Sequence, residues 1–224
     1  MSNKHWSKEE IDKLNTLLNN NVKQSTIAKE LNRSITSVQL KIKRLKLKEG
    51  TYNEKHQLNK YLANKKYLDY LKPKSVLDVY AGSKSYYENK VDNLITNDIN
   101  TDYKTNYNLN AFDLLCQLYL DKVTFDLIDL DPYGSAAENV YLATKLANKG
   151  LIVTYGELGH KKFKRLDYVS KFYNINTLDD FNLKNLINHT KLIAKQNKKV
   201  LEVHTAYMFY AGLGRVYYKV NEQT

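Results

Sequence analysis

A buried strand that ends at a proline limits the possible folds of this chain more than any other feature. Residues 125–130 alternate Asp with Leu and Ile, and Asp131-Pro132-Tyr133-Gly134 follow without a break. Proline lacks an N–H and has a fixed φ, so the strand must stop there and the next residues must form a loop. In an open α/β sheet this loop would lie at the carboxyl edge, where such sheets bind ligands.

Strand and helix patterns alternate around this stretch. Short apolar runs predict strands, and longer runs with helical spacing predict the helices between them. This alternation indicates an α/β fold with a parallel sheet, and the last two strands predict a terminal hairpin. The expected strands are 75–80, 94–98, one that ends within 109–113, 125–130, 150–154, 199–210 and 215–220, and the expected helices are 58–71, 113–120, 135–148, 161–172 and 178–196.

The ends of the first three strands carry residues suited to a nucleotide-like cofactor. Gly82 allows the tight turn and close backbone approach that a cofactor needs beside a strand end. Asp98 follows at a spacing, after the first strand, at which a carboxylate binds the hydroxyl pair of a ribose. Asn110 or Asp113 can hydrogen-bond an adenine amino group, with Phe112 against the adenine ring.

The N-terminal part predicts a helix-turn-helix. Ser7 and Glu10 form a capping-box pattern, and two further short helices are predicted at 24–31 and 35–46. The pattern Trp-Ser-x-Glu-Glu … Ile-Ala-x-Glu-Leu-Asn-Arg-Ser … Val … Ile-x-x-Leu resembles the Myb/SANT-like helix-turn-helix modules of many phage and mobile-element proteins over about residues 5–47. The resemblance implies a small domain that binds nucleic acid.

In such a module the third helix enters the major groove of DNA. A glutamine on that helix can read an adenine edge, while lysines and arginines hold phosphates. The alternative is a solvated basic helix that packs on a protein partner. The predicted nucleic-acid-binding residues are Arg33, Thr36, Ser37, Gln39, Lys43 and Arg44.

The positive charge of the chain is concentrated at its N-terminal end. Residues 1–66 hold 15 Lys and Arg against 6 Asp and Glu, a net charge of +9, out of +11 for the whole chain. This one-sided placement is typical of a module that binds nucleic acid. AT-rich codon usage can raise the Lys, Asn and Tyr content, but it does not explain the placement.

Composition and boundaries complete the expected organisation. The sequence predicts a helix-turn-helix domain at 1–48, a linker at 49–56 and a catalytic domain at 57–224. No apolar run is long enough to span a bilayer, and the N-terminus lacks the apolar segment of a signal peptide. The single Cys116 excludes an internal disulfide, and no Cys/His cluster has zinc spacing. We therefore expect a cytoplasmic protein without a bound metal.

The five βα units and the terminal hairpin resemble the Rossmann-like, seven-stranded sheet of class I S-adenosyl-L-methionine (SAM)-dependent methyltransferases. Within that class, residues 97–100, 129–135 and 154–159 resemble the tRNA N2,N2-dimethylguanosine methyltransferase family, which carries Asp-Pro-Phe-Gly at the position of Asp131-Pro132-Tyr133-Gly134. The resemblance covers about residues 52–165. It implies SAM as cofactor and a nucleobase amine as the methyl acceptor.

The resemblance assigns roles residue by residue. Asp131, Pro132 and Tyr133 would face the target amine as catalytic residues. Two features depart from the family: the turn after the first strand lacks an arginine, and a basic helix-turn-helix stands in front of the core in place of a large C-terminal tRNA-binding domain. DNA adenine methyltransferases carry Asp-Pro-Pro-Tyr instead. The predicted cofactor-binding residues are Asp78, Tyr80, Ala81, Gly82, Asp98, Asn110, Ala111, Phe112 and Asp129, and no metal ligand is predicted.

Three functions remain open from the sequence. A carboxylate that accepts the N–H bonds of a nucleobase amine, beside a stacking aromatic ring, suits methyl transfer to that amine, and Asp131 and Tyr133 supply both groups. The helix-turn-helix favours DNA as the substrate. The alternatives are an RNA N2-guanine methyltransferase and a non-catalytic DNA-binding regulatory protein on a degenerate methyltransferase scaffold. The more ordinary interpretation of Asp126 and Asp129 is that both are solvated strand residues.

Overall fold

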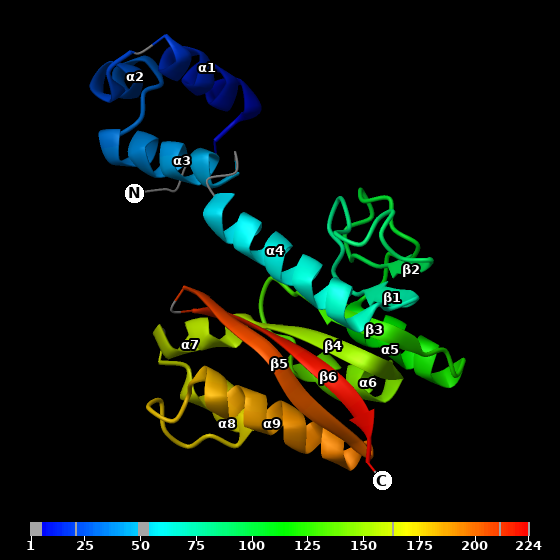
Figure 1. Cartoon of the computed structure of the whole chain (residues 1–224). Coiled ribbons are helices and arrows are strands. Elements are labelled where there is room, and N and C mark those ends of the chain that lie inside the picture. The colour runs from blue at the N-terminus through cyan, green and yellow to red at the C-terminus, as the bar shows by residue number, and fades with distance from the viewer. Residues whose placement is uncertain (1–5, 21, 49–53, 163, 211, 224) are drawn as a thin grey trace. The chain divides into compact units, whose positions relative to one another are not determined.

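A computed structural model describes residues 6–20, 22–48, 54–162, 164–210 and 212–223. The chain divides into two compact units, Met1–Lys60 and Tyr61–Thr224 (Figure 1). The predicted boundaries at 48 and 56 stay predictions, and residues 49–53 of the expected linker lie outside the described residues.

The N-terminal unit contains the three predicted short helices, α1 (Lys8–Asn19), α2 (Gln24–Glu30) and α3 (Ile35–Lys48). The capping box forms as predicted, because Ser7 Oγ accepts the N–H of Glu10 while the Glu10 carboxylate accepts the N–H of Ser7. Their apolar faces meet in a small core of Leu14, Ile27, Ala28, Leu31, Val38 and Ile42. The predicted helical spacing therefore accounts for this unit.

The larger unit is built on a mixed sheet with the strand order β2-β1-β3-β4-β6-β5. The first four strands in this order are parallel, and β6 runs antiparallel between β4 and β5 (Figure 1). The α/β class and the terminal hairpin are confirmed. The strands are β1 (Ser75–Asp78), β2 (Asn93–Thr96), β3 (Phe125–Leu130), β4 (Ala147–Tyr155), β5 (Lys199–Tyr210) and β6 (Leu213–Glu222).

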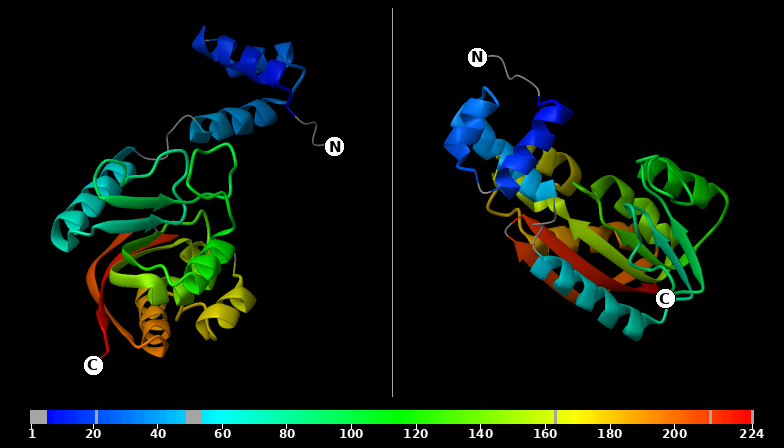
Figure 2. Two further views of the ribbon diagram at one scale, coloured as in Figure 1. Left: turned by 90° about the vertical axis from the view of Figure 1, so that its right-hand side faces the viewer. Right: turned by 90° about the horizontal axis from the view of Figure 1, so that it is seen from above.

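Helices cover both faces of this sheet (Figure 2). On one face, α5 (Ala111–Leu120), α6 (Ala137–Leu146) and α9 (Leu183–Gln196) supply apolar side chains to the larger core. On the other face, Ala63 and Tyr67 of α4 (Glu54–Leu71) pack against a smaller core. Because side chains alternate along a strand, each central strand contributes to both cores.

Two short helices, α7 (Gly159–Lys162) and α8 (Leu166–Tyr173), replace the single helix predicted at 161–172, and a 3-10 turn, η1 (Gly156–Leu158), precedes them. The predicted helix at 178–196 begins five residues later, where Asn182 caps α9 by accepting the N–H of Asn185. Among the described residues, no helix has both the length and the apolar character needed to cross a membrane.

The prediction of seven strands is wrong by one, because the described residues form a six-stranded sheet. The expected third strand is reduced to a single bridge between Asn97 and Tyr107. The residues between Asn97 and Asn108 are mostly polar, and some of their side chains bind backbone groups that a strand would use. The Asn108 side-chain amide, for example, donates to the carbonyl oxygens of Asp98 and Asn100 at 3.1 Å each. Such local bonds compete with a strand ladder.

Candidate active site at the carboxyl edge of the sheet

The predicted loop leaves β3 at the carboxyl edge of the sheet. Leu130 is fully buried, whereas the side chain of Asp131 is 25% exposed and the ring of Tyr133 is fully exposed. The chain thus passes within three residues from the core to the surface, as expected for a strand that a proline ends. An exposed aromatic ring next to a carboxylate can bind a flat, polar molecule.

A buried arginine holds the carboxylate of Asp131. Arg215 lies on β6, its side chain is completely buried, and its Nη1 lies 3.2 Å from Asp131 Oδ1. Its Nη2 donates to Asp129 Oδ2 at 2.6 Å, so one guanidinium links Asp129 of β3 with Asp131 of the loop that follows. The remaining hydrogen bonds of Arg215 go to Thr154 Oγ1 at 2.5 Å, Tyr217 Oη at 3.1 Å and Asn64 Oδ1 at 3.3 Å.

This arginine stays charged despite its burial. Desolvation acts to lower the pKa of Arg215. The carboxylates of Asp129 and Asp131 raise it by more than this, so the pKa lies well above the ordinary value. A buried guanidinium is stable only when its donors are satisfied, and each of its three nitrogens donates a hydrogen bond, to Tyr217, Thr154 and Asp129 respectively. Asp131 therefore lies against a permanent positive charge.

Asp129 belongs to this network and is not the solvated strand residue of the alternative interpretation. It is buried, and its Oδ2 accepts hydrogen bonds from Tyr87 Oη and from Arg215, both at 2.6 Å. Its assignment as a cofactor-binding residue stays a prediction, and the structure shows that one of its two carboxylate oxygens is held by Tyr87 and Arg215. Oδ1 has no hydrogen-bond partner among the described residues.

The predicted cofactor residues gather beside β1 and β2. Gly82 has a φ of +63°, which favours glycine, and space is open where a side chain would stand. Its N–H donates to Asp98 Oδ2 at 3.0 Å, and the N–H of Asn100 donates to Asp98 Oδ1 at 2.9 Å. Each carboxylate oxygen keeps a further lone pair, so the half-buried Asp98 can still accept hydroxyl groups.

The start of α5 is tied to the same edge. Buried Asn97 donates to the carbonyl oxygens of Val79 and Leu109 at 3.1 Å, which joins the end of β1 to the segment before α5. Asn110 then caps α5 by accepting the N–H of Phe112, whose ring is 45% exposed. The predicted adenine-binding residues therefore lie next to the end of β1.

Three other predicted cofactor residues are largely enclosed. Asp78 is buried and accepts a hydrogen bond from Ser85 Oγ at 2.6 Å, and Ala81 is also buried. Tyr80 accepts a hydrogen bond from the side-chain amide of Asn139 at 2.7 Å, and burial raises its pKa to about 12. These three side chains therefore lie beneath the exposed residues of the carboxyl edge and expose little or none of their own surface.

A buried glutamate fixes the loop after β3 to the end of β4. Glu157 Oε1 accepts hydrogen bonds from Ser135 Oγ at 2.8 Å, the N–H of Ala136 at 2.9 Å and Tyr173 Oη at 2.6 Å. Burial raises the pKa of Glu157, although these bonds act to lower it. The loop that carries Tyr133 is thus anchored directly behind its exposed ring.

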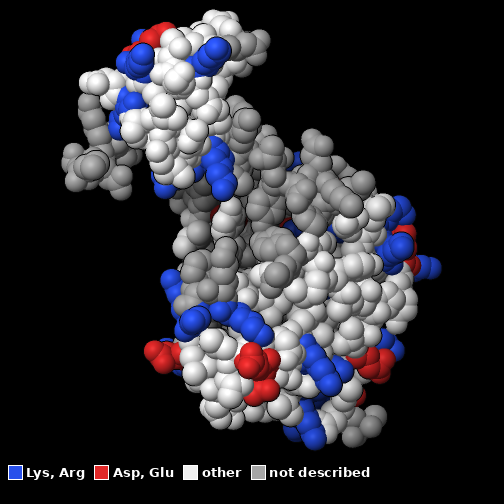
Figure 3. All heavy atoms as spheres, turned by 90° about the vertical axis from the view of Figure 1, so that its left-hand side faces the viewer, with Lys and Arg blue, Asp and Glu red and all other residues white. Residues whose placement is uncertain are grey.

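The predicted nucleic-acid residues differ in accessibility. Thr36, Gln39, Lys43 and Arg44 are exposed on α3, and Ser37 is partly buried. The side chain of Arg33 is only 7% exposed and forms a bidentate ion pair with Glu10, so its contact with nucleic acid stays a prediction. Figure 3 shows more basic than acidic side chains on the visible face of this unit. The four exposed residues of α3 are therefore accessible to a ligand.

Sequence reasoning did not identify Arg215, Tyr87, Asn64 or Glu157 as site residues. Arg215 is separated from Asp129 by 86 positions and stands in an ordinary strand pattern. The same strand also carries Lys219 and Glu222, so its sequence does not single out Arg215 as a buried charge. Glu157 had appeared in the family resemblance without a role.

Comparisons with known proteins identify a shared fold. No protein-family model matches the chain, and no curated protein matches it. Trm1 from Pyrococcus horikoshii, solved with S-adenosyl-L-methionine, matches 76% of this chain with a TM-score of 0.62 and 19% identity. This chain spans 56% of that Trm1 chain. An O-methyltransferase from Bacillus cereus, solved with SAH, matches 69% of this chain and 77% of its own at 13% identity and a TM-score of 0.46. The chain therefore has the methyltransferase fold predicted from its sequence.

Proposed function

We propose that the protein is a SAM-dependent methyltransferase that acts on an exocyclic amine of a nucleobase. One observation carries the proposal: Asp131 stands at the carboxyl edge of the sheet, paired with buried Arg215 and beside the exposed ring of Tyr133. A fixed carboxylate and a flat apolar surface are the two groups that methyl transfer to a base amine requires.

The residues at the ends of β1 and β2 fit SAM. Asp98 keeps lone pairs for the ribose hydroxyls, the space at Gly82 admits a ligand against the backbone, and Phe112 offers an exposed ring next to the cap of α5. Neighbours of the same fold were solved with SAM or SAH. When bound, SAM supplies an electrophilic methyl group.

Asp131 makes the amine a better nucleophile. The lone pair of an exocyclic amine is delocalised into the ring, and a carboxylate that accepts the amine N–H bonds localises it on nitrogen. Tyr133 stacks on the base and limits its orientation. The contribution of the protein is therefore positioning and electrostatic stabilisation.

DNA is the first candidate substrate, because exposed Gln39, Lys43 and Arg44 lie on the third helix of the N-terminal unit. In this proposal the unit docks duplex DNA and the target base is flipped out, at a cost of a few kcal/mol. RNA is the second candidate, favoured by the fold shared with Trm1 and by the resemblance of the Asp-Pro-Tyr-Gly loop. Tritium transfer from labelled SAM to duplex DNA, single-stranded DNA and tRNA separates the two.

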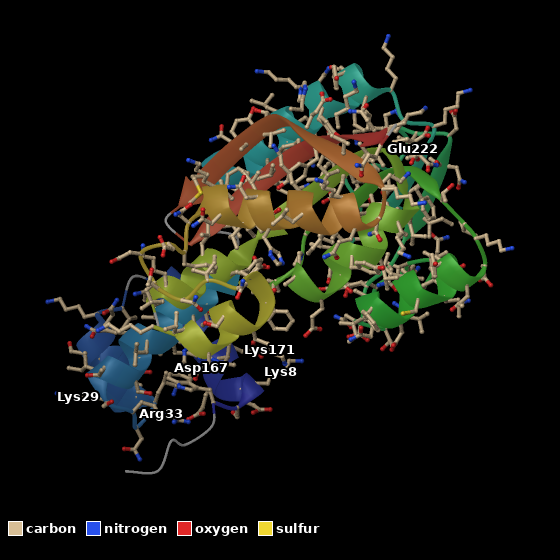
Figure 4. All side chains as sticks on the ribbon, turned by 90° about the horizontal axis from the view of Figure 1, so that it is seen from below. Lys8, Lys29, Arg33, Asp167, Lys171 and Glu222 are labelled. Atoms are coloured by element: carbon tan, nitrogen blue, oxygen red, sulfur yellow. The ribbon has the colours of Figure 1, made fainter. Side chains whose placement is uncertain are left out.

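Replacing Asp131 tests the proposed chemistry. We expect Asp131→Asn to lower the rate of methyl transfer by about 10²–10⁴-fold, because the amide accepts N–H bonds less strongly and cannot take a proton. Asp167→Asn, an exposed carboxylate on α8 (Figure 4), should leave the rate unchanged. Calorimetry with SAM checks that the variant still binds cofactor. Full activity in Asp131→Asn would contradict the assigned role, and no SAM binding by the wild type would favour the non-catalytic alternative.

A further inference from the structure

We propose that Arg215 is a positioning residue for Asp131 and that Asp129 is the counter-ion that lets Asp131 accept a proton. The inference deepens the proposed function and rests on it for the identity of the reaction. It starts from the geometry of the three side chains, which form an acid–arginine–acid cluster across β3 and β6.

The cluster is built by the register of the sheet. Asp129 lies on β3 and Asp131 directly follows Leu130, the last residue of that strand, so the two acids are two positions apart and both side chains reach Arg215. β4 pairs with both neighbours, and its Thr154 is the partner of Arg215. Arg215 Nη2 donates to Asp129 and Nη1 pairs with Asp131, so the planar fork fixes the distance between the two acids.

Of the three side chains in the cluster, Asp131 is the most exposed. The side chain of Asp129 is 5% exposed and that of Arg215 is not exposed, whereas that of Asp131 is 25% exposed. Asp131 is thus the member of the cluster that a substrate can reach. Asp129 and Arg215 act on the substrate through it.

Counted over its own three side chains, Asp129, Asp131 and Arg215, the cluster has a formal net charge of −1. Tyr87 lies between β1 and β2, Tyr217 lies on β6, and burial raises the pKa of both, so they remain neutral donors. Asp78 on β1 is the nearest other acid by register, since it pairs with Asp129, and Ser85 Oγ satisfies one of its oxygens. The described side chains of α4 that reach the cluster contribute the neutral amide of Asn64.

This charge balance decides how basic Asp131 is. A single Arg–Asp pair would hold Asp131 strongly in its ionised form and make it a poor proton acceptor. Asp129 also pairs with the guanidinium of Arg215, and its negative charge repels that of Asp131. Both effects weaken the net electrostatic stabilisation of the ionised form of Asp131. When Asp131 gains a proton, Arg215 stays paired with Asp129, and the buried cluster becomes neutral rather than positive.

The proton is released after the new bond has formed. The lone pair of the amine nitrogen forms a bond to the methyl carbon, the bond from that carbon to sulfur breaks, and its electron pair goes to sulfur. The nitrogen then loses one proton to the carboxylate of Asp131, which passes it to water. Arg215 holds Asp131 in place throughout, without changing its own protonation.

Titration of Asp131 tests the coupling without requiring activity. In the full chain with ¹³C-labelled aspartate carboxyls, the Asp131 signal is identified by its absence in Asp131→Asn. We expect Asp129→Asn to lower the Asp131 pKa by roughly one unit or more, and Arg215→Gln to raise it by about 1–3 units. Asp126→Asn, on the same strand but paired with Lys149, is the matched control and should move it little.

Enzyme kinetics provides the second readout. The acidic limb of the rate of methyl transfer against pH should move in the same direction and by the same amount as the Asp131 titration in each variant. A merely structural role would lower activity without moving this limb. If Arg215→Gln does not fold, the nearly isosteric Asp129→Asn still decides the outcome.

The two proposals fail in distinguishable ways. An Asp131 titration in Asp129→Asn that moves no more than in Asp126→Asn would overturn the counter-ion role of Asp129, and one in Arg215→Gln that does not rise would overturn the role of Arg215, even in an active enzyme. A wild type that transfers no methyl group to any nucleic acid, while the Asp131 titration shifts as expected, would reject the proposed function and leave the charge coupling standing.

Discussion

Glu157 is the residue whose burial has the clearest consequence for stability. Its side chain is fully buried, three donors converge on Oε1, and Oε2 has no hydrogen-bond partner within the described part of the chain. Burial raises its pKa above the ordinary value of 4.5. The folded state therefore binds this proton more tightly than the unfolded state. Above about pH 4.5, this residue makes the free energy of unfolding fall as pH rises through the raised pKa.

Replacement of Glu157 by glutamine tests this sign. The amide oxygen can keep the three hydrogen bonds, and the buried charge is removed. We expect Glu157→Gln to have a higher free energy of unfolding than the wild type at pH 7, and to lack the decrease that begins near pH 4.5. Urea denaturation at a series of pH values measures both. Exposed Glu138→Gln serves as the control, and a Glu157→Gln protein destabilised at pH 7 with an unchanged pH slope would contradict the prediction.

At the residue scale, the functional groups at the end of β3 could be predicted from the sequence. Asp131, Pro132 and Tyr133 follow each other directly, so the stop of β3 and the exposure of the ring followed from proline alone. Arg215 did not follow, because its partnership depends on which strands become neighbours. A long-range ion pair is a property of topology, and local spacing carries no record of it.

The close contact between the loops after β3 and β4 matters at the scale of elements. A side chain on Gly156 would collide with the carbonyl oxygen of Gly134, whereas a side chain on Gly134 would meet open space. Glycine at position 156 thus lets the two loops touch. This contact supplements the hydrogen bonds of Glu157 and holds the loop of Tyr133 against the end of β4.

We expect Gly156→Ala to destabilise the protein by about 1–3 kcal/mol, because the obstructing atom is backbone and cannot move aside without shifting the loop. Gly134→Ala should change stability by less than about 0.5 kcal/mol. Chemical denaturation of both variants measures the difference. Equal stability of the two would show that the contact is relieved by a small movement of the loop.

Elements with strong local signals were predicted best. The capping box of Ser7 and Glu10, the three N-terminal helices and the hairpin of β5 and β6 formed as expected. The expected third strand did not, because Asn108 and its polar neighbours bind nearby backbone groups. Strand patterns report apolar alternation, and they do not register side chains that compete for the same backbone bonds.

At the scale of the whole molecule, charge separates the two functions proposed for the chain. Residues 1–66 carry +9 of the net charge of +11, and exposed Lys43 and Arg44 belong to that part. The carboxyl edge instead pairs acids with a buried arginine. Affinity for a polyanion and chemistry at a base are thus expected to respond to different variants.

Salt dependence tests this separation. We expect Lys43→Ala with Arg44→Ala to weaken DNA binding across sequences and to reduce the slope of log affinity against log salt by about two, one for each lost phosphate contact. Lys8→Ala, exposed on α1 (Figure 4), is the matched control and should change the slope less. Fluorescence anisotropy with labelled duplex DNA between about 50 and 200 mM salt measures the slopes. Equal slopes in the double variant and the wild type would exclude α3 as the docking helix.

The polar segment beside β2 also affects self-association, because β2 is an edge strand of the sheet. An open sheet edge offers N–H and C=O groups that can recruit a foreign strand and begin aggregation. At this edge, Asn106 Oδ1 accepts the N–H of Thr96 at 2.8 Å, and the Thr96 carbonyl oxygen accepts the N–H of Tyr107 at 3.1 Å. Both backbone groups of Thr96 are already occupied within the chain. The shortened third strand thus leaves a sheet edge that resists self-association at this point.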